Sequence, residues 1–320
     1  MKALVVRFSA IGDCVMAVPV AASIREKCPD AEIVWAVEPR CSAVIDTERL
    51  VNELALFDRN RWQRARWSPA TWKHQMSCYL SLRKHSFDIG IDLQGQSKTA
   101  LCLRLAKPAK CIAVRGHDLL SKSLNPIVET VRGNMHTVEH HMIALAALGD
   151  FSKKVRFIMP ELKEQRKALA GLLPSGRLAT IAVSAAGAGK AYPIEGWNSV
   201  AEALISRGFA VAFVGGPGDP SSPCEKATDL VGKLPLDQTM AAIMMSAVHL
   251  AADTGSGHIA AAYGIPVVSV FGKTPPHIFR PYTDLGIVLD GVTSPTNVKP
   301  EDIVGAVESL LQRTGEAVSS

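Results

Sequence analysis

The sequence predicts an α/β protein made of two Rossmann-like halves, each built on a parallel sheet. Short apolar runs of strand length alternate with amphipathic stretches of helical length along the whole chain. This alternation occurs in two sets, which are separated near residues 150–177, where Pro174, Ser175 and Gly176 interrupt the pattern. The length of 320 residues also favours two domains over a single small core.

Five apolar runs predict the strands of the first half, with helices between most of them. The runs cover residues 3–7, 32–37, 53–57, 88–92 and 110–114. The clearest helical stretches lie at residues 100–105 and 138–148. These alternating units are typical of a parallel sheet connected by helical crossovers.

The second half begins with a helical stretch at residues 162–173, and its predicted strands are 178–183, 210–214, 248–252 and 266–270. An apolar face with helical spacing predicts a helix that ends at Gly208; its residues are Trp197, Val200, Ala201, Leu204 and Ile205. A second apolar stripe, from Ile303 to Leu311, predicts a final helix. We therefore expect domains at residues 1–160 and 161–320, with the final helix packing back on the N-terminal domain.

Composition restricts the partners and the compartment. The net charge of +5 suits phosphorylated ligands, nucleic acid or an acidic membrane surface, and it does not choose among them. The seven cysteines have no C-x-x-C spacing, so neither a disulfide framework nor a zinc site is indicated. No apolar run reaches the roughly 18 residues that a membrane-spanning helix needs, and we expect a cytoplasmic protein.

The first candidate site follows the first predicted strand, at residues 8–13. A small turn containing Gly12 precedes a helix there, which leaves backbone N–H groups free at the helix N-terminus. Asp13 has two interpretations: a carboxylate that caps the first turn, or a general base that accepts a proton from an attacking hydroxyl. Position alone favours the cap.

The second candidate is residues 253–258, which follow an apolar strand and open a helix. Gly255, Gly257 and Ala260 have the spacing of a dinucleotide fingerprint. However, the next strand ends in Phe271, Gly272 and Lys273, without the acidic residue that would hold a ribose. The pattern therefore favours a diphosphate-sized anion site over a nicotinamide site, and an empty tight turn is the other interpretation.

The third candidate is the loop at residues 185–190. It resembles a Walker A loop only in part, because Ser184 replaces the first glycine and Ala191 replaces the Mg-binding hydroxyl residue. ATPase chemistry is therefore not expected. Lys190 could neutralise charge on a departing phosphate, or it could be an exposed loop lysine.

Two further segments could bind a second substrate. Residues 59–74 contain three of the five tryptophans and a cluster of basic residues that includes Arg61 and Arg64. Such a segment could stack on bases, pack against sugars, lie at an anionic membrane face, or be a solvated surface helix. The residues after the strand that ends at Asp92 include Gln94, Gln96 and Lys98, which could meet a polyhydroxylated acceptor or be ordinary loop residues.

The sequence resembles the bacterial lipopolysaccharide heptosyltransferase family (glycosyltransferase family 9). The matching pieces are residues 7–13, 92–95, 253–258 with Ala260 and Ala261, and 264–274. Their order and spacing hold across most of the chain. The resemblance implies a GT-B fold, with two Rossmann-like domains whose parallel sheets face across a cleft. It places acceptor binding in the N-terminal domain and nucleotide-sugar binding in the C-terminal one.

The resemblance also implies roles for individual residues. Asp13 matches the family's catalytic base, and Lys190 matches a lysine that contacts phosphate. The positions that match the donor-binding block are Asp253, Thr254, Gly255, Ser256, Gly257 and His258. We expect Ser9, Arg61, Arg64, Gln94 and Lys98 to bind the acceptor. No metal ion and no other cofactor is expected.

The chain departs from the family pattern at two places. Ala185, Ala186 and Ala188 stand where the family often has polar residues ahead of the lysine. The glutamate that commonly meets the adenosine ribose has no clear counterpart in residues 215–219, where Asp219 is the nearest substitute.

The resemblance implies an inverting, metal-independent transferase that moves heptose from an ADP-heptose-like donor to an inner-core lipopolysaccharide acceptor, an anionic glycolipid. We expect peripheral contact with the inner membrane and no binding of nucleic acid. A sugar-nucleotide epimerase on the same fold is one alternative, and donor turnover without an acceptor would distinguish it. A non-catalytic nucleotide or nucleic-acid binder is another, and it predicts salt-dependent affinity for oligonucleotides.

Overall fold

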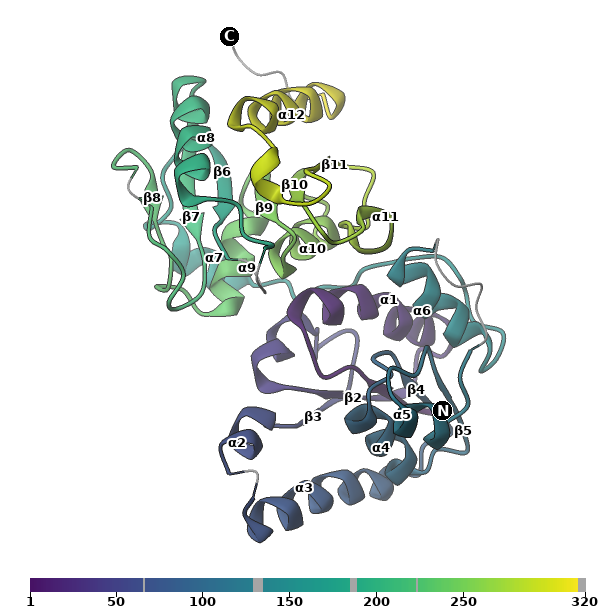
Figure 1. Cartoon of the computed structure of the whole chain (residues 1–320). Coiled ribbons are helices and arrows are strands. Elements are labelled where there is room, and N and C mark those ends of the chain that lie inside the picture. The colour runs from purple at the N-terminus through teal and green to yellow at the C-terminus, as the bar shows by residue number, and fades with distance from the viewer. Residues whose placement is uncertain (66, 129–134, 185–188, 223, 316–320) are drawn as a thin grey trace. The chain divides into compact units, whose positions relative to one another are not determined.

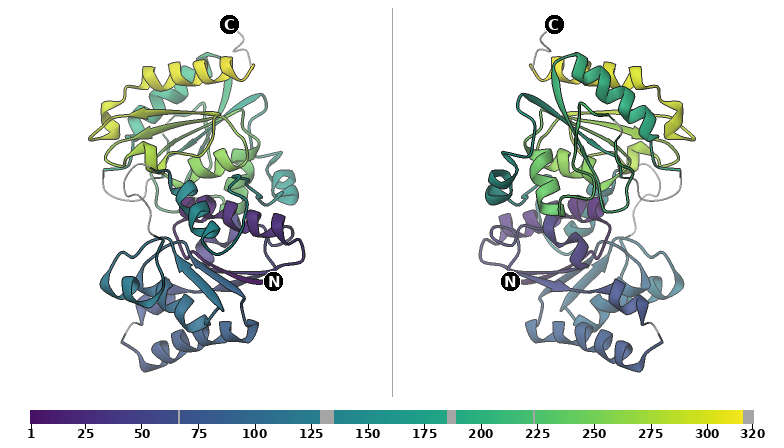
Figure 2. Two further views of the ribbon diagram at one scale, coloured as in Figure 1. Left: turned by 90° about the vertical axis from the view of Figure 1, so that its right-hand side faces the viewer. Right: turned by 90° about the vertical axis from the view of Figure 1, so that its left-hand side faces the viewer.

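The computed structural model describes residues 1–65, 67–128, 135–184, 189–222 and 224–315. The chain divides into two compact domains, Met1–Pro160 and Glu161–Ser320 (Figure 1). Each domain contains one parallel sheet with helices packed against it, as the two side views in Figure 2 also show. The predicted α/β fold class is confirmed.

The N-terminal sheet has the strand order β3-β2-β1-β4-β5, and all of its strand pairs are parallel. The strands are β1 (Lys2–Val6), β2 (Glu32–Val37), β3 (Glu53–Leu56), β4 (Ile89–Asp92) and β5 (Lys110–Ala113). The chain first moves outward from β1 to β3 and then returns to place β4 on the other side of β1. Ligands of open α/β sheets bind at the carboxyl ends of the strands where this order reverses.

The helices of this domain are α1 (Ile11–Lys27), α2 (Arg59–Arg64), α3 (Pro69–Ser81), α4 (Ser97–Ala106), α5 (Leu119–Leu124) and α6 (Thr137–Ala146), with 3-10 turns η1 (Pro39–Val44) and η2 (Leu82–His85). Helix α1 is buried from Cys14 to Ile24 and packs on α6. An apolar helix buried on most sides is therefore what holds the loop after β1 in place.

The C-terminal sheet has the order β11-β10-β9-β6-β7-β8 and is also parallel. Its strands are β6 (Arg177–Ala182), β7 (Phe209–Val214), β8 (Thr228–Asp229), β9 (Val248–Ala252), β10 (Val267–Phe271) and β11 (Gly286–Asp290). The order reverses between β6 and β9, so the second predicted ligand position lies at the carboxyl ends of these two strands.

The helices of the C-terminal domain are α7 (Lys163–Leu169), α8 (Ile194–Ser206), α9 (Leu236–Met244), α10 (Gly255–Ala262), α11 (Pro276–Phe279) and α12 (Pro300–Arg313), with one 3-10 turn, η3 (Pro295–Asn297). Helix α12 packs on α8, β10 and β11. Its apolar stripe, from Ile303 to Leu311, lies in the core of its own domain. The expected packing of this helix on the N-terminal domain stays a prediction.

All nine predicted strands are present, with ends that differ from the predicted ones by at most one residue. Strands β8 and β11 were not predicted. Both lie at edges of the C-terminal sheet and none of their residues is buried. Strand β8 has only two residues, both polar, whereas β11 contains an apolar run at residues 287–289 that sequence reasoning missed. Among the described residues, no helix is both long enough and apolar enough to cross a membrane.

Candidate functional site

Polar side chains gather at the carboxyl ends of β1 and β4 in the N-terminal domain, where the strand order reverses. Arg7 directly follows β1, and its side chain is only 3% exposed. Its Nη2 lies 2.6 Å from Oδ2 of Asp13, in the first turn of α1. The same oxygen accepts a hydrogen bond from the backbone N–H of Ala10 at 3.0 Å. Asp13 therefore does cap α1, and a buried arginine also fixes its carboxylate.

Asp13 also remains accessible to a ligand. Its side chain is 30% exposed, in contrast to the buried arginine beside it. The Ser9–Ala10 peptide bond in the preceding loop is cis, and Ser9 is half-buried there. A carboxylate side chain at a helix N-terminus with part of its surface open can both cap the helix and act as a general base.

The loop after β4 is joined to the loop after β1. Gln94 accepts a hydrogen bond from the backbone N–H of Phe8 at 3.0 Å, through Oε1. Its Nε2 donates to Oε1 of Gln96, also at 3.0 Å. Gly95 has a φ of +71°, and a Cβ there would lie 2.2 Å from the carbonyl oxygen of Arg115. Only glycine fits this turn, which holds Gln94 across the reversal point.

Asp92, the last residue of β4, stabilises the same turn through its side chain. Its Oδ1 accepts hydrogen bonds from the backbone N–H groups of Gln94 and Gly95, each at 2.9 Å. Burial raises the pKa of Asp92 to about 6, and the two backbone hydrogen bonds oppose that rise. This carboxyl is completely buried, so its role is to shape the loop rather than to touch a ligand.

A basic cluster surrounds this position. Burial lowers the pKa of Lys98, in the first turn of α4, to about 8, and Arg59, Arg7 and Arg40 add to the effect. Glu38, which is 3% exposed, partly compensates their charge. It accepts hydrogen bonds from Arg40 Nε and Arg59 Nη1, each at 2.9 Å.

Arg115 belongs to the same cluster, because its charge acts on His117 and His140 and is itself influenced by Arg7 and Asp13. Cations therefore outnumber carboxylates around Asp13. Such a surface favours an anionic ligand.

The structure brings only some of the predicted acceptor residues together. Gln94 and Lys98 lie in this cluster, and Ser9 is in the adjoining loop. Arg61 and Arg64 are exposed and lie on other faces of α2 than Arg59.

Sequence reasoning missed Arg7, Glu38, Arg40 and Arg115 as site residues. Arg7 stood inside the first motif, which was a usable signal. The other three come from segments that only the strand order brings together, so no local pattern marked them.

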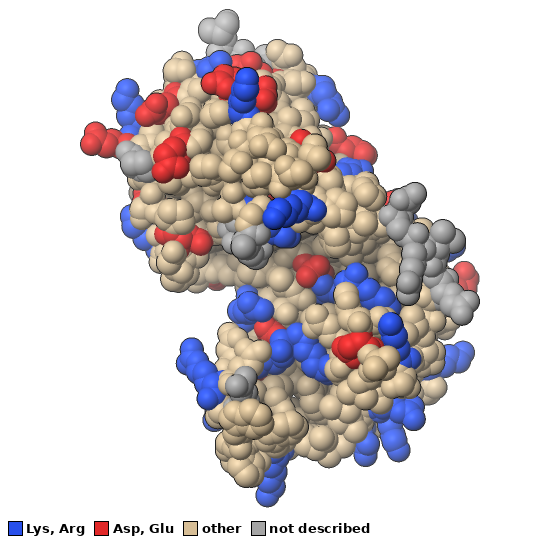
Figure 3. Space-filling model, viewed as in Figure 1, with Lys and Arg blue, Asp and Glu red and all other residues tan. Residues whose placement is uncertain are grey.

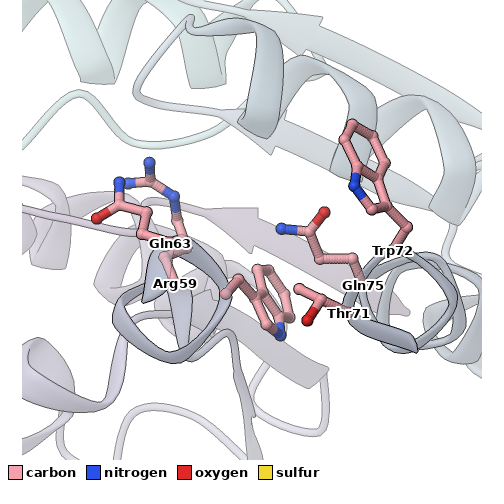
Figure 4. A pocket seen from close by; sticks show the side chains of 6 residues that line it. Arg59, Gln63, Thr71, Trp72 and Gln75 are labelled. Carbon is pink, nitrogen blue, oxygen red and sulfur yellow. The ribbon is translucent and has the colours of Figure 1, made fainter. Parts of the chain in front are cut away.

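Helices α2 and α3 enclose a pocket of about 160 Å³, which Figure 4 shows from close by. Its lining residues are Arg59, Trp62, Gln63, Thr71, Trp72 and Gln75. Trp62 is buried and its Nε1 donates to Nδ1 of His74 at 3.1 Å, which ties α2 to α3. Since Arg59 also binds Glu38, the pocket adjoins the basic cluster. Indole rings with amide groups suit a hydroxyl-rich ligand.

In the C-terminal domain, residues from the loops after β6 and β9 meet at the second reversal point. Lys190 Nζ lies 2.6 Å from Oδ2 of Asp253, whose side chain is 9% exposed. Thr254 caps α10, and its Oγ1 lies 2.8 Å from Oγ of Ser256. Two of the predicted donor-binding segments are thus in direct contact, through residues that are 63 positions apart.

The start of α10 is suited to an anion. A Cβ on Gly257 would lie 3.3 Å from Pro281 Cγ and 3.4 Å from Ser269 Oγ, so the helix packs closely against its neighbours there. No acidic residue lies in the first turn, which leaves the positive end of the helix dipole uncompensated within the helix. His258 is buried one residue further on.

Two predicted features of this domain have different outcomes. Ala185, Ala186 and Ala188 lie outside the described residues. Asp219 accepts hydrogen bonds from the backbone N–H of Gly216 at 2.6 Å and from the hydroxyl of Ser184, both through Oδ2. This carboxylate therefore stabilises the loop after β7.

In the described part of the chain, no group of three or more His, Cys, Asp or Glu side chains could hold a metal ion.

Comparisons with known proteins identify the family and the fold. The family model for glycosyltransferase family 9 (heptosyltransferase) matches residues 76–302. Lipopolysaccharide heptosyltransferase 3 of Escherichia coli K12 is 26% identical over 94% of this chain and 95% of its own length.

Two solved structures share the fold. The glycosyl transferase family 9 structure from Veillonella parvula has a TM-score of 0.82 at 18% identity, covering 98% of this chain and 97% of that one. The E. coli heptosyltransferase WaaC with ADP has a TM-score of 0.76 at 20% identity, covering 98% and 99%. The fold is therefore GT-B, and the epimerase and nucleic-acid-binder alternatives are not favoured. With a family match over most of its length, this chain belongs to glycosyltransferase family 9, the heptosyltransferases.

Proposed function

We propose that the protein is an inverting, metal-independent heptosyltransferase. It would transfer heptose from an ADP-heptose-like donor to the inner core of lipopolysaccharide. The observation that carries this proposal is the pair of sites at the two reversal points: a partly exposed carboxylate at one and a lysine beside a helix N-terminus at the other. One supplies a proton acceptor and the other an anion site.

The acceptor is assigned to the N-terminal domain, residues 1–160, because the basic cluster surrounds Asp13 there. An inner-core acceptor is an anionic glycolipid, which suits Lys98, Arg40 and Arg59. Gln94 and Ser9 are the polar, uncharged residues of the same loops, and we assign them to acceptor hydroxyls. Arg61 and Arg64, being exposed on other faces of α2, would contact only a larger part of the acceptor.

The donor is assigned to the C-terminal domain, residues 161–320. Its diphosphate would lie at the start of α10, against the backbone N–H groups of Gly255 and Gly257. Lys190 would contact the phosphates while Asp253 and Thr254 fix the loop. The E. coli heptosyltransferase WaaC, which has the same fold, is described with ADP bound. ADP is therefore the first nucleotide to test.

The chemistry follows from these assignments. Asp13 accepts the proton of an acceptor hydroxyl while the hydroxyl oxygen forms a bond to the anomeric carbon of heptose. The bond from that carbon to the diphosphate oxygen breaks, and the diphosphate leaves with the electron pair. Attack from the face opposite the leaving group inverts the anomeric configuration. Lys190 and the N–H groups of α10 stabilise the leaving group, which is the work that a metal ion does in other transferases.

The expected location, cytoplasmic with peripheral contact to the inner membrane, forms part of this proposal. Between residues 59 and 87 the chain has seven Lys and Arg residues and no Asp or Glu. On α3, Trp72 is 61%, Met76 41% and Leu80 38% exposed, at a spacing that places them on one helix face. Exposed apolar residues in a basic segment are typical of contact with an anionic membrane surface.

The central test replaces Asp13 by Asn, which keeps the size of the side chain. We expect transfer to fall by about 10²–10⁴-fold, the usual contribution of a general base, while calorimetry still shows ADP binding. Asp302→Asn is the matched control. Asp302 holds the same third position of α12, where it accepts from the backbone N–H of Lys299. Transfer by Asp13→Asn at the wild-type rate would refute the proposal.

A further inference from the structure

The ion pair between Lys190 and Asp253 leaves little charge for a ligand. The two side chains are 2.6 Å apart and the carboxylate is 9% exposed, so the pair is close to neutral as a unit. A diphosphate carries more than one negative charge and needs more than a neutral pair and one helix end. A further cation near this position would therefore strengthen the binding of a diphosphate.

Lys273 is that cation. Its Nζ lies 3.8 Å from the position of a Cβ on Gly189, the residue directly before Lys190. Lys273 follows β10, whereas Gly189 follows β6, and β9 lies between these two strands in the sheet. The lysine side chain therefore extends past the carboxyl end of β9, which is where Asp253, Thr254 and the start of α10 follow.

Close packing of the preceding residue fixes the backbone position of Lys273. A Cβ on Gly272 would lie 2.5 Å from Cδ and 2.8 Å from N of Pro295, at the start of η3. The residue before Lys273 is thus packed directly against another backbone, and only glycine fits there. The lysine itself is exposed, so its base is held while its ammonium group can move.

The charge of Lys273 is not neutralised. Within the described residues it forms no ion pair with a carboxylate. Residues 185–188, which precede Gly189, are Ala, Ala, Gly and Ala, so they supply no carboxylate either. The sequence carries this lysine where a dinucleotide-binding domain would carry a ribose-binding acid, and that exchange favours a phosphate.

We propose that Lys273 binds the diphosphate of the donor. Its positive charge would replace the charge of Lys190 that the Asp253 carboxylate neutralises. This inference rests on the proposed function for the identity of the donor. Lys273 would strengthen ground-state binding of the diphosphate, and it would follow the added negative charge when the bond to heptose breaks. The anion could also be a free pyrophosphate, which shares the same chemistry.

The test is calorimetric titration of the whole 320-residue chain with ADP, AMP, adenosine and inorganic pyrophosphate. For Lys273→Met we expect ADP and pyrophosphate affinity to fall by about 10- to 100-fold, the usual effect of losing a hydrogen bond to a charged group. AMP should lose less, and adenosine should bind as it does to the wild type. Lys273→Arg should restore most of the ADP affinity.

Lys167→Met is the matched control. It removes the same charge from the same domain at a side chain that is 79% exposed on α7, and ADP affinity should not change. The inference would be overturned if Lys273→Met bound ADP and pyrophosphate with the same affinities as the wild type does. It would also be overturned if the variant lost as much affinity for adenosine as for ADP. If the wild type bound pyrophosphate but not ADP, the assigned donor would be refuted. The pyrophosphate affinity of Lys273→Met would then still test whether Lys273 binds an anion.

Discussion

Asp92 is the last residue of β4 and Lys98 lies in the helix that follows it, and burial shifts their pKa values toward each other. The pKa of Asp92 rises to about 6 and that of Lys98 falls to about 8. Both shifts have the same physical cause, because burial disfavours the charged form of either side chain. Each shift predicts a different pH dependence, one in substrate binding and one in stability.

Lys98 should make acceptor binding pH-dependent. Because its pKa is about 8, it is charged below pH 8 and loses its charge as the pH rises through that value. We expect the KM for an anionic acceptor to rise by up to about tenfold from pH 7 to pH 9. Lys98→Arg stays charged and should keep a flatter profile. Identical acceptor profiles in the two proteins would contradict this role, and the donor KM serves as the internal control.

The titration of Asp92 should make the folded protein less stable as the pH rises. Its pKa in the folded protein, about 6, lies above the ordinary value of 3.8, so the folded protein holds a proton that the unfolded chain has lost. Stability is therefore highest below pH 4 as far as this group is concerned, and it decreases up to pH 6. The shift of about two units corresponds to about 3 kcal/mol.

Asp92→Asn cannot titrate, so its stability relative to the wild type should increase by up to that amount between pH 4 and pH 7. Urea unfolding at several pH values measures the difference, in which all other titrating groups cancel. A difference that does not change with pH would show that Asp92 is ionised throughout. The asparagine oxygen can still accept from Gln94 and Gly95, so the loop should be kept.

At the scale of the elements, α3 has two faces with different tasks. Tyr79 is buried in the N-terminal core, where it stacks on Phe57. Met76 and Leu80 instead line a shallow hollow on the surface together with Lys73. The exposed face is therefore free to meet a membrane without disturbing the fold.

We expect Met76→Gln with Leu80→Gln to weaken binding to vesicles of phosphatidylglycerol and phosphatidylcholine by at least about tenfold, because two apolar side chains can no longer enter the interface. Co-sedimentation measures binding, and vesicles of phosphatidylcholine alone should bind the wild type weakly. Leu172→Gln with Met245→Gln is the control, since these side chains are 54% and 38% exposed in the C-terminal domain. Equal losses in both double variants, or none in the first, would exclude α3 as the contact.

The elements also show how far sequence alone could go. Central strands such as β1 and β9 were predicted because burial on both faces leaves a continuous apolar run. Asp13, Lys190 and Asp253 were proposed as site residues because they stand in local motifs, and the structure places them at the points where the strand order reverses. The Lys190–Asp253 contact and the position of Lys273 were not predicted, since both depend on the order β10-β9-β6, which no local window contains.

On the scale of the whole molecule, charge is divided between the domains. Residues 1–160 have 23 Lys and Arg against 15 Asp and Glu, whereas residues 161–320 have 12 against 15. Figure 3 shows many blue side chains over the N-terminal domain in this view. The net positive charge thus belongs to the domain to which we assign the anionic acceptor. We propose that the acidic domain binds its own anion locally, through Lys190, Lys273 and one helix end.

The opposite signs of the two domains have a consequence for the purified protein. At low ionic strength, the basic half of one molecule attracts the acidic half of another, and each copy can do this at both halves. Head-to-tail chains of molecules would then form and raise the turbidity of a concentrated solution. Added salt would dissociate these chains of molecules, because it screens the attraction between exposed charges and leaves the buried contacts of each molecule unchanged.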